Sequence, residues 1–124
     1  MTPHPLPPTP SFVAARLPVC GARVLVVAVA RSVLADRPSA HLYIEAFQRY
    51  FGRTVVLMAQ DPLLVPSYYG PEPIVRSLAG VPFEVIPWRR FVYDHERAQR
   101  WWLPVPPLPE ELPSGSSWVP ETEP

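Results

Sequence analysis

Four polar side chains could form a ligand site if the apolar runs of this chain are parallel strands. Arg31 follows the first run, Asp61 and Tyr69 follow the second, and Arg89 follows the third. In open parallel sheets, ligands bind beyond the carboxyl ends of the strands. Two guanidiniums beside the helix start at Gly70 suit an anion, and the Asp61 carboxylate could orient the ligand or act as an acid or base. The spacing predicts a ligand edge of these four residues, although polar loops that only cap and pair locally account for them as well.

A second group with chemical potential lies between Trp88 and Trp102, where arginines alternate with aromatic rings. The candidates for binding a partner are Trp88, Arg90, Arg97, Arg100, Trp101 and Trp102. Arginine and tryptophan are enriched in the hot spots of protein interfaces, and arginines with aromatic rings also hold single-stranded nucleic acid. Two acids, Asp94 and Glu96, offset half of the segment's four arginines, which leaves little charge for nucleic acid. The segment therefore favours packing on the protein's own core or binding another protein.

The chain contains no recognisable catalytic or cofactor-binding motif. It has neither a glycine-rich phosphate loop nor a serine in a nucleophile elbow. The single cysteine, Cys20, excludes an internal disulfide and a four-cysteine zinc site. His41 and Glu45 have the spacing of metal ligands on a helix, but a site needs at least one more ligand. We expect no metal and no cofactor, and we favour a binding protein over an enzyme without excluding the enzyme.

Composition limits the chain to one small domain. It has 124 residues, of which 20 are prolines, and its 11 basic residues, all arginines, balance 11 acids, so no net charge attracts nucleic acid or anionic membranes. The absence of lysine and asparagine indicates a GC-rich, bacterial genome. The longest apolar run, 24–30, is far shorter than the roughly 20 residues of a membrane span, and the proline-rich start is unlike a secretory signal. We expect a cytoplasmic protein without a membrane segment.

The apolar periodicity predicts alternating strands and helices. Residues 23–29 and 54–59 are β-branched runs of strand length, which suits strands buried on both faces. Between them, apolar residues of 36–51 recur at helical spacing, and Gly52 follows as a left-handed cap. A shorter, proline-led helix is expected at 71–79.

A third strand is expected at 83–86, where the flanking Pro82 and Pro87 favour the edge of a sheet. The order strand, helix, strand, helix, strand predicts the α/β class: a small three-layer β-α-β-α-β domain with a mostly parallel three-stranded sheet and proline-rich flexible termini. The alternative is an α+β fold in which the third strand pairs antiparallel. A last helix is expected from Asp94 to Trp102.

Prolines concentrate at both ends of the chain and suggest its domain limits. We expect a proline-rich disordered arm at 1–19, a single α/β domain at 20–102, and a proline-rich acidic tail at 103–124. The tail contains P-x-x-P spacing within 105–109, which is typical of a polyproline-II segment.

Three functional hypotheses follow. The leading one is a small non-enzymatic interaction or accessory protein that binds another protein, or a second copy of itself, through the arginine-aromatic segment and the tail; a half-sheet this small leaves edges to cover. The second is a small enzyme or anionic-ligand-binding domain that uses the carboxyl edge of the sheet. Weak nucleic-acid binding ranks third, and no membrane partner is expected.

Overall fold

The structure, a computed structural model, describes residues 11–92 and 106–110. The strands are β1 (Ser11–Val19), β2 (Ala22–Ala28), β3 (Thr54–Gln60), β4 (Pro66–Tyr69) and β5 (Arg89–Val92). The helices are α1 (Arg31–Ala35), α2 (Arg37–Phe51), α3 (Glu72–Ala79) and the 3-10 helix η1 (Phe83–Val85). None of these helices is long and apolar enough to cross a membrane.

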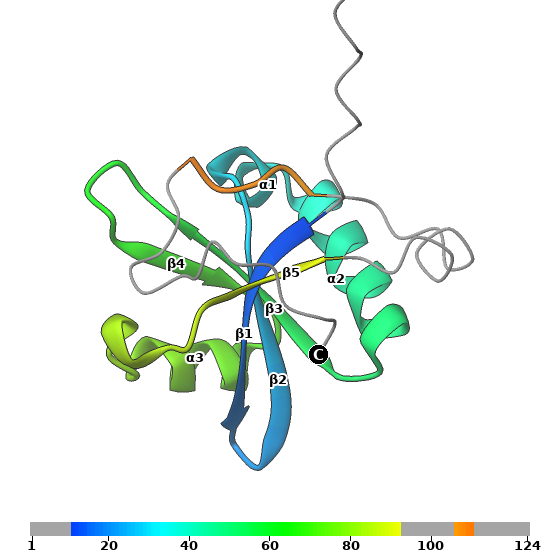
Figure 1. Ribbon diagram of the computed structural model, residues 1–124, viewed down its shortest axis with the longest axis vertical. Helices are drawn as coiled ribbons and strands as arrows, with labels where there is room; N and C mark the ends of the chain where they lie inside the picture. The colour runs from blue at the N-terminus through cyan, green and yellow to red at the C-terminus, as the bar shows by residue number, and fades with distance from the viewer. Residues whose placement is uncertain (1–10, 93–105, 111–124) are drawn as a thin grey trace, which may run out of the picture.

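The five strands form one mixed sheet in the order β4-β3-β2-β1-β5 (Figure 1). Strands β2 and β3 are parallel and are joined through α1 and α2, as the strand-helix-strand pattern predicts. The three remaining pairs of neighbours are antiparallel. The domain therefore mixes helices and strands as expected for an α/β or α+β fold, but its parallel part is a single pair.

Strand β1 corrects the expectation of a disordered arm at 1–19. Residues 11–19 pair with β2 on one side and β5 on the other, whereas 1–10 lie outside the described residues. The first half of β1 is buried on both faces, so it lacks the alternation of apolar and polar residues by which a strand is recognised in a sequence. The prolines before it therefore decided the sequence-based prediction. Cys20 and Gly21 join β1 to β2 with φ angles of 51° and 75°, the positive pair that a two-residue type I′ hairpin requires.

The third strand predicted at 83–86 is wrong. Phe83–Val85 forms a 3-10 turn, and the strand begins at Arg89. Prolines on both sides of 83–86 limit the backbone N–H groups that a ladder needs. The strand that follows, β5, pairs antiparallel with β1, so the last strand has the direction of the α+β alternative but consists of different residues.

The sheet has an apolar core on each face. On β1, Phe12 and Ala14 belong to the cluster under α1 and α2, whereas Val13 and Ala15 belong to the cluster under α3 and η1. This alternation is the period-two geometry of a strand. Figure 1 shows α2 and α3 on opposite sides of the central strands. We call these the α2 face and the α3 face of the sheet.

Helix α2 confirms the helix that the apolar spacing of 36–51 predicts. It buries Ala40, Ile44, Phe47 and Tyr50 against the sheet, which is the expected apolar stripe. Gly52 ends it in the left-handed conformation, with φ 67°, and donates its N–H to the carbonyl of Gln48 at 2.8 Å. The chain then turns directly through Arg53 into β3.

Candidate anion-binding site

The structure places Arg31 and Asp61 together at the carboxyl ends of β2 and β3. Both line a cavity of about 20 Å³, which holds about one water molecule. Glu110, from the described C-terminal segment 106–110, lines the same cavity. The predicted meeting of two side chains at this edge therefore occurs, but the space between them is too small for an organic ligand.

Asp61 organises the turn that follows β3. Its Oδ1 accepts hydrogen bonds from the backbone N–H groups of Leu63 at 2.8 Å and Val65 at 2.9 Å, and its carbonyl accepts one from Leu64. This is the local side-chain-to-backbone bonding that aspartate makes in turns. The carboxylate thus binds its own loop, as expected for a polar loop residue that pairs locally.

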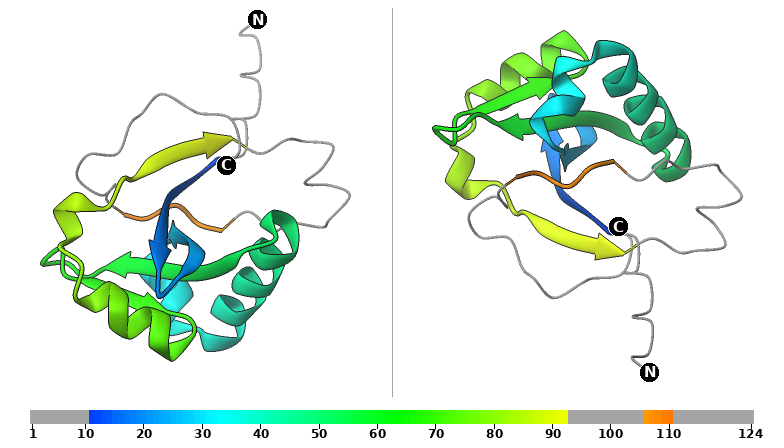
Figure 2. Two further views of the ribbon diagram at one scale, coloured as in Figure 1. Left: turned by 90° about the horizontal axis from the view of Figure 1, so that it is seen from below. Right: turned by 90° about the horizontal axis from the view of Figure 1, so that it is seen from above.

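Arg31 is engaged by the chain's own C-terminal segment. Its backbone N–H donates to Oε1 of Glu110 at 3.1 Å, and its Nε lies 3.4 Å from Oε2. The segment 106–110, orange in Figures 1 and 2, runs past the start of α1, where the N–H of Ala30 donates to the carbonyl of Pro107 at 3.0 Å. The backbone N–H of Glu110 itself, and then the N–H and charge of Arg31, hold the pKa of the Glu110 carboxyl below its ordinary value.

Tyr69 and Arg89 do not join this edge, which corrects the predicted set of four. Tyr69 lies on β4 and Arg89 on β5, at opposite ends of the strand order, with three strands between them. The reason is the placement of the last strand: β5 pairs with β1 instead of extending a parallel sheet. Tyr69 is half-buried against the core of the α2 face.

The arginine-aromatic segment is described only in its first part. Trp88 is 1% exposed and its ring lies 5.7 Å from that of Phe83, so Trp88 belongs to the core of the α3 face and not to a partner surface. Arg90 donates from Nε to Oγ of Ser11 at 3.1 Å. The other partner candidates and the expected last helix lie outside the described residues: Arg97, Arg100, Trp101 and Trp102. The interaction hypothesis for them stays a prediction.

The other reactive side chains considered in the sequence, Cys20, His41 and Glu45, lie at exposed positions. The Cys20 sulfur lies 2.9 Å from Oγ of Ser77, exposed to solvent. His41 and Glu45 form an exposed pair at 3.1 Å. Within 11–92 and 106–110, no three histidine, cysteine or acidic side chains are placed to hold a metal ion.

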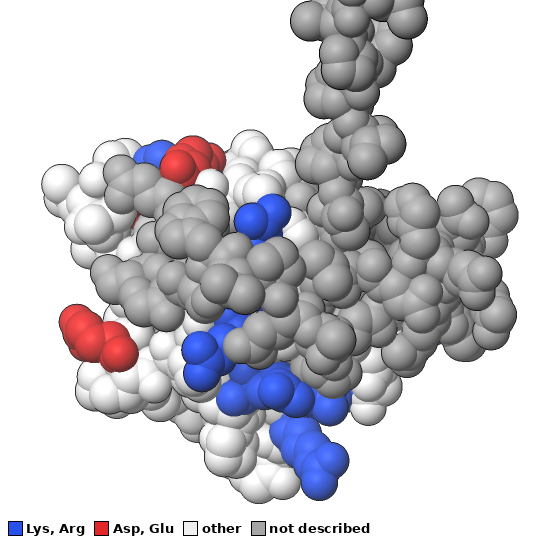
Figure 3. Space-filling model, viewed as in Figure 1, with Lys and Arg blue, Asp and Glu red and all other residues white. Residues whose placement is uncertain are grey.

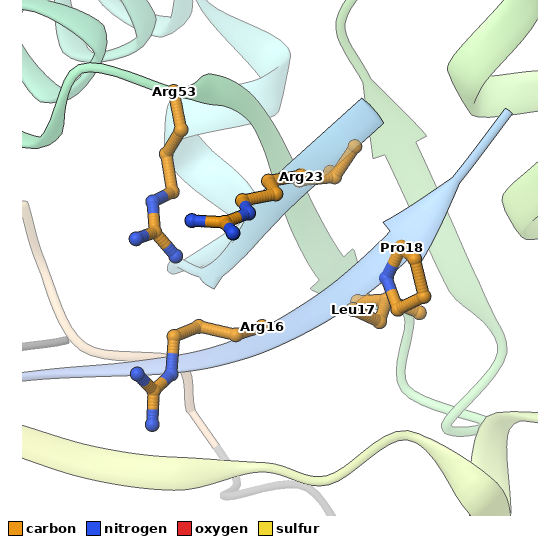
Figure 4. A pocket seen from close by; sticks show the side chains of 6 residues that line it. Arg16, Leu17, Pro18, Arg23 and Arg53 are labelled. Carbon is orange, nitrogen blue, oxygen red and sulfur yellow. The ribbon is translucent and has the colours of Figure 1, made fainter. Parts of the chain in front are cut away.

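Sequence reasoning missed an open pocket lined by three arginines. Arg16 from β1, Arg23 from β2 and Arg53 directly before β3 line a pocket of about 490 Å³, which Leu17, Pro18 and Val24 complete. Figure 4 shows the guanidiniums of Arg23 and Arg53 turned towards one another and that of Arg16 reaching towards β5. We call this the arginine pocket.

The alternation of strand residues places all three arginines on the α2 face. Arg16 continues the row of Phe12 and Ala14 on β1, and the register of Val24 with Thr54 puts Arg23 opposite Arg53. Helix α2 ends just before Arg53, so this part of the face lies beyond the helix. The carbonyl end of a helix favours nearby cations, which accounts locally for Arg53 but not for the other two.

No carboxylate is paired with these arginines among the residues that the structure describes. The ion pairs found there are Arg31 with Glu110, His41 with Glu45, and Arg76 with Glu72. Arg16 lies with its guanidinium carbon 5.8 Å from the ring centre of Phe91, which holds the side chain without neutralising it. Figure 3 shows basic side chains gathered over the β1-β2 hairpin, with the visible acidic side chains elsewhere. Although the whole chain has no net charge, the surface around the arginine pocket therefore carries an excess of positive charge among the described residues.

The arginine pocket leaves only one weak signal in the sequence. Its three guanidiniums come from positions 16, 23 and 53. These positions are neighbours because β2 lies between β1 and β3 in the sheet. That signal is the spacing of Arg16 from Phe12 and Ala14 by even numbers of residues, which puts the three on one face only if β1 is recognised as a strand.

Comparison of the chain with models of known protein families, with curated proteins and with solved structures found no match.

Proposed function

We propose that this protein binds a ligand with several negative charges in the arginine pocket, as an anion-binding module. The observation that carries the proposal is that Arg16, Arg23 and Arg53 line one open pocket without an acidic partner among the described residues. The proposal keeps the anionic-ligand hypothesis drawn from the sequence but assigns the ligand to a different site. The carboxyl edge of β2 and β3 is engaged by Glu110, whereas the opposite end of the same strands is open.

The chemistry of the guanidinium group supports phosphate, sulfate or carboxylate as the ligand group. Arginine stays charged at all physiological pH values and presents a planar fork of N–H donors that matches two oxygens of one anion. Arg53 directly precedes β3, and the parallel register of Val24 with Thr54 brings it beside Arg23, where the two like charges repel each other. An anion between them removes that repulsion, so binding and folding favour the same arrangement.

The lining of the pocket supports binding more than catalysis. The six lining residues include no carboxylate, imidazole, hydroxyl or thiol that could transfer a proton or act as a nucleophile. Guanidiniums alone hold and orient charge. The proposal is therefore one of recognition, and it adds no reaction.

A thermal-shift measurement with inorganic tripolyphosphate tests the proposal. At about ten times the dissociation constant, a ligand specific for the folded state adds roughly 1.4 kcal/mol, which corresponds to about 5–10 °C for a domain of this size. The variant with Arg16, Arg23 and Arg53 all changed to alanine should show no shift. The matched control is Arg37→Ala, which removes the same charge at the far end of α2, about 20 Å away along the helix axis. Equal shifts in the triple variant and the wild type would refute the arginine pocket as the site.

A further inference from the structure

The C-terminal segment 106–110 lies in the position of a ligand. It crosses the carboxyl ends of β2 and β3, where open sheets bind their ligands. The backbone N–H of Ala30 donates to the carbonyl of Pro107, and the backbone N–H of Arg31 donates to the carboxylate of Glu110. The guanidinium of Arg31 lies beside the same carboxylate. The domain therefore holds this segment as a peptide ligand is held, through its main chain and one charge.

The burial of this segment follows the turn of a polyproline-II helix. Proline fixes φ near −65°, and a polyproline-II helix has three residues per turn, so positions 106 and 109 lie on the same side. Pro106 is buried and Pro109 is half-buried, whereas Pro107 and Leu108 between them are exposed. The P-x-x-P spacing in the sequence thus marks the two prolines that face the domain. A segment with this many fixed φ angles loses little conformational entropy when it binds.

The loop that receives the segment is held in shape by its own hydrogen bonds. Pro109 lines the small cavity at this edge together with Asp61 and Leu64. Oδ1 of Asp61 accepts two backbone N–H groups of the loop, and Nε2 of Gln60 donates to the carbonyl of Leu64 at 3.1 Å. Leu64 has a φ of 65°, which is uncommon for a residue with a side chain. None of these hydrogen bonds involves 106–110, so the loop keeps its shape when the segment leaves.

The chain's own segment leaves apolar surface uncovered beside this loop. Leu63 is 83% exposed, and the next two side chains, Leu64 and Val65, are exposed as well. The ion pair of Arg31 with Glu110 is open to solvent, and such pairs contribute little to stability. A ligand that made the same contacts and also covered the apolar side chains would bury surface that now faces water. Such a ligand would bind more tightly than the segment that it replaces.

The geometry points to a peptide-binding site at the carboxyl ends of β2 and β3 for a proline-rich segment of a partner protein, in which P-x-x-P spacing is followed directly by a carboxylate. In the free protein, residues 106–110 occupy this site and compete with the partner. A second copy of the chain offers only the contacts that the attached segment already makes, whereas a partner gains by covering 63–65. The inference is independent of the proposed anion binding, because the arginine pocket lies at the opposite end of β2 and β3.

Fluorescence anisotropy with a labelled peptide that has the sequence of residues 104–110 tests the inference on the full chain. Glu110→Ala weakens the chain's own segment, so this variant should bind the peptide about fivefold more tightly than wild type does. Adding Arg31→Ala to that variant should weaken binding about fivefold. Arg76→Ala in the same background is the matched control, because Arg76 forms the same kind of exposed pair with Glu72 on α3.

Changes in the peptide test the same contacts without altering the protein. Replacing its glutamate by glutamine should weaken binding up to about fivefold. Replacing the prolines that correspond to Pro106 and Pro109 by alanine should abolish binding, because both the packing and the fixed φ angles are lost. Equal binding of the alanine peptide would overturn recognition of the polyproline-II turn.

The remaining outcomes decide whether the site exists and what occupies it. If the peptide binds neither wild type nor Glu110→Ala, the segment is a permanent part of the fold and the inference is overturned. Equal effects of Arg31→Ala and Arg76→Ala would place the binding elsewhere. A wild-type dimer in analytical ultracentrifugation that the peptide dissociates would identify a second copy as the occupant and overturn the partner protein. The variant that lacks Arg16, Arg23 and Arg53 should still bind the peptide, which separates this site from the arginine pocket. Circular dichroism of each variant confirms that it is folded.

Discussion

Arg31 contacts Glu110 through both its backbone N–H and its guanidinium, although 79 residues separate the two in the chain. The contact fastens the segment 106–110 to the carboxyl ends of β2 and β3. A carboxylate of the protein thus lies where open sheets commonly bind a ligand. This explains why the edge that sequence reasoning favoured holds a cavity for one water molecule only.

The Glu110 contact predicts a pH-dependent contribution to stability. The pKa of Glu110 is lowered in the folded state, so its contribution is complete above the ordinary value of 4.5 and is lost as the pH falls through the lowered folded-state value. The carboxylate is exposed to solvent, and such pairs contribute about 0–1 kcal/mol. Urea unfolding of wild type and Glu110→Gln should therefore differ slightly at pH 7 and converge near pH 3. A difference that persists at pH 3 would show that the effect of the substitution is not electrostatic.

Reversing one charge in the arginine pocket should stabilise the protein and abolish its binding. Arg23→Glu places a carboxylate beside Arg53, where repulsion becomes attraction, and exposed pairs of opposite charge contribute about 0.2–1 kcal/mol. Arg23→Gln, which removes the charge without reversing it, should give a smaller gain in the free energy of unfolding. Tripolyphosphate should stabilise neither variant as it does wild type. Stability gained while binding is lost is the signature of residues kept for function.

Gly52 should not tolerate a side chain, because its backbone is left-handed. Gly52→Ala places a Cβ at φ 67° and should destabilise the protein by about 1–2 kcal/mol, although no atom lies near the added carbon. Gly80→Ala is the matched control: Gly80 also ends a helix, but its φ is −87° and its Cβ would meet only an ordinary contact. Thermal unfolding should show Gly80→Ala unchanged or slightly stabilised. Equal losses in both variants would contradict the strain at Gly52.

Trp88 should matter for folding and not for binding a partner. Trp88→Ala empties a fully buried position and should cost about 3–5 kcal/mol. Trp88→Phe keeps much of the ring and also removes an indole N–H that has no hydrogen-bond partner within 11–92 and 106–110, so it should cost clearly less. Denaturant unfolding monitored by far-UV circular dichroism measures both. A folded, fully stable Trp88→Ala variant would restore Trp88 as a candidate for a partner surface.

The sequence by itself determined the parts of the fold that depend on local chemistry. The spacing of Ala40, Ile44, Phe47 and Tyr50 specified α2, and Gly52 specified its end. The β-branched runs specified β2 and β3, and their continuous apolar character indicated burial on both faces. These features are legible because helix periodicity and strand propensity involve neighbours in the chain.

Only the tertiary structure decided which strands are neighbours, and with that the site. Pairing of β5 with β1 separated Arg89 from Tyr69 and moved it to the α2 face, because partner choice depends on contacts between residues more than 70 positions apart. The same pairing buried Trp88, and the fold of 106–110 gave Arg31 a carboxylate partner. Arg16 and Arg23 are neighbours through the hairpin of β1 and β2, but Arg53 joins them only through the parallel pairing of β2 with β3, a long-range relationship that no spacing in the chain encodes.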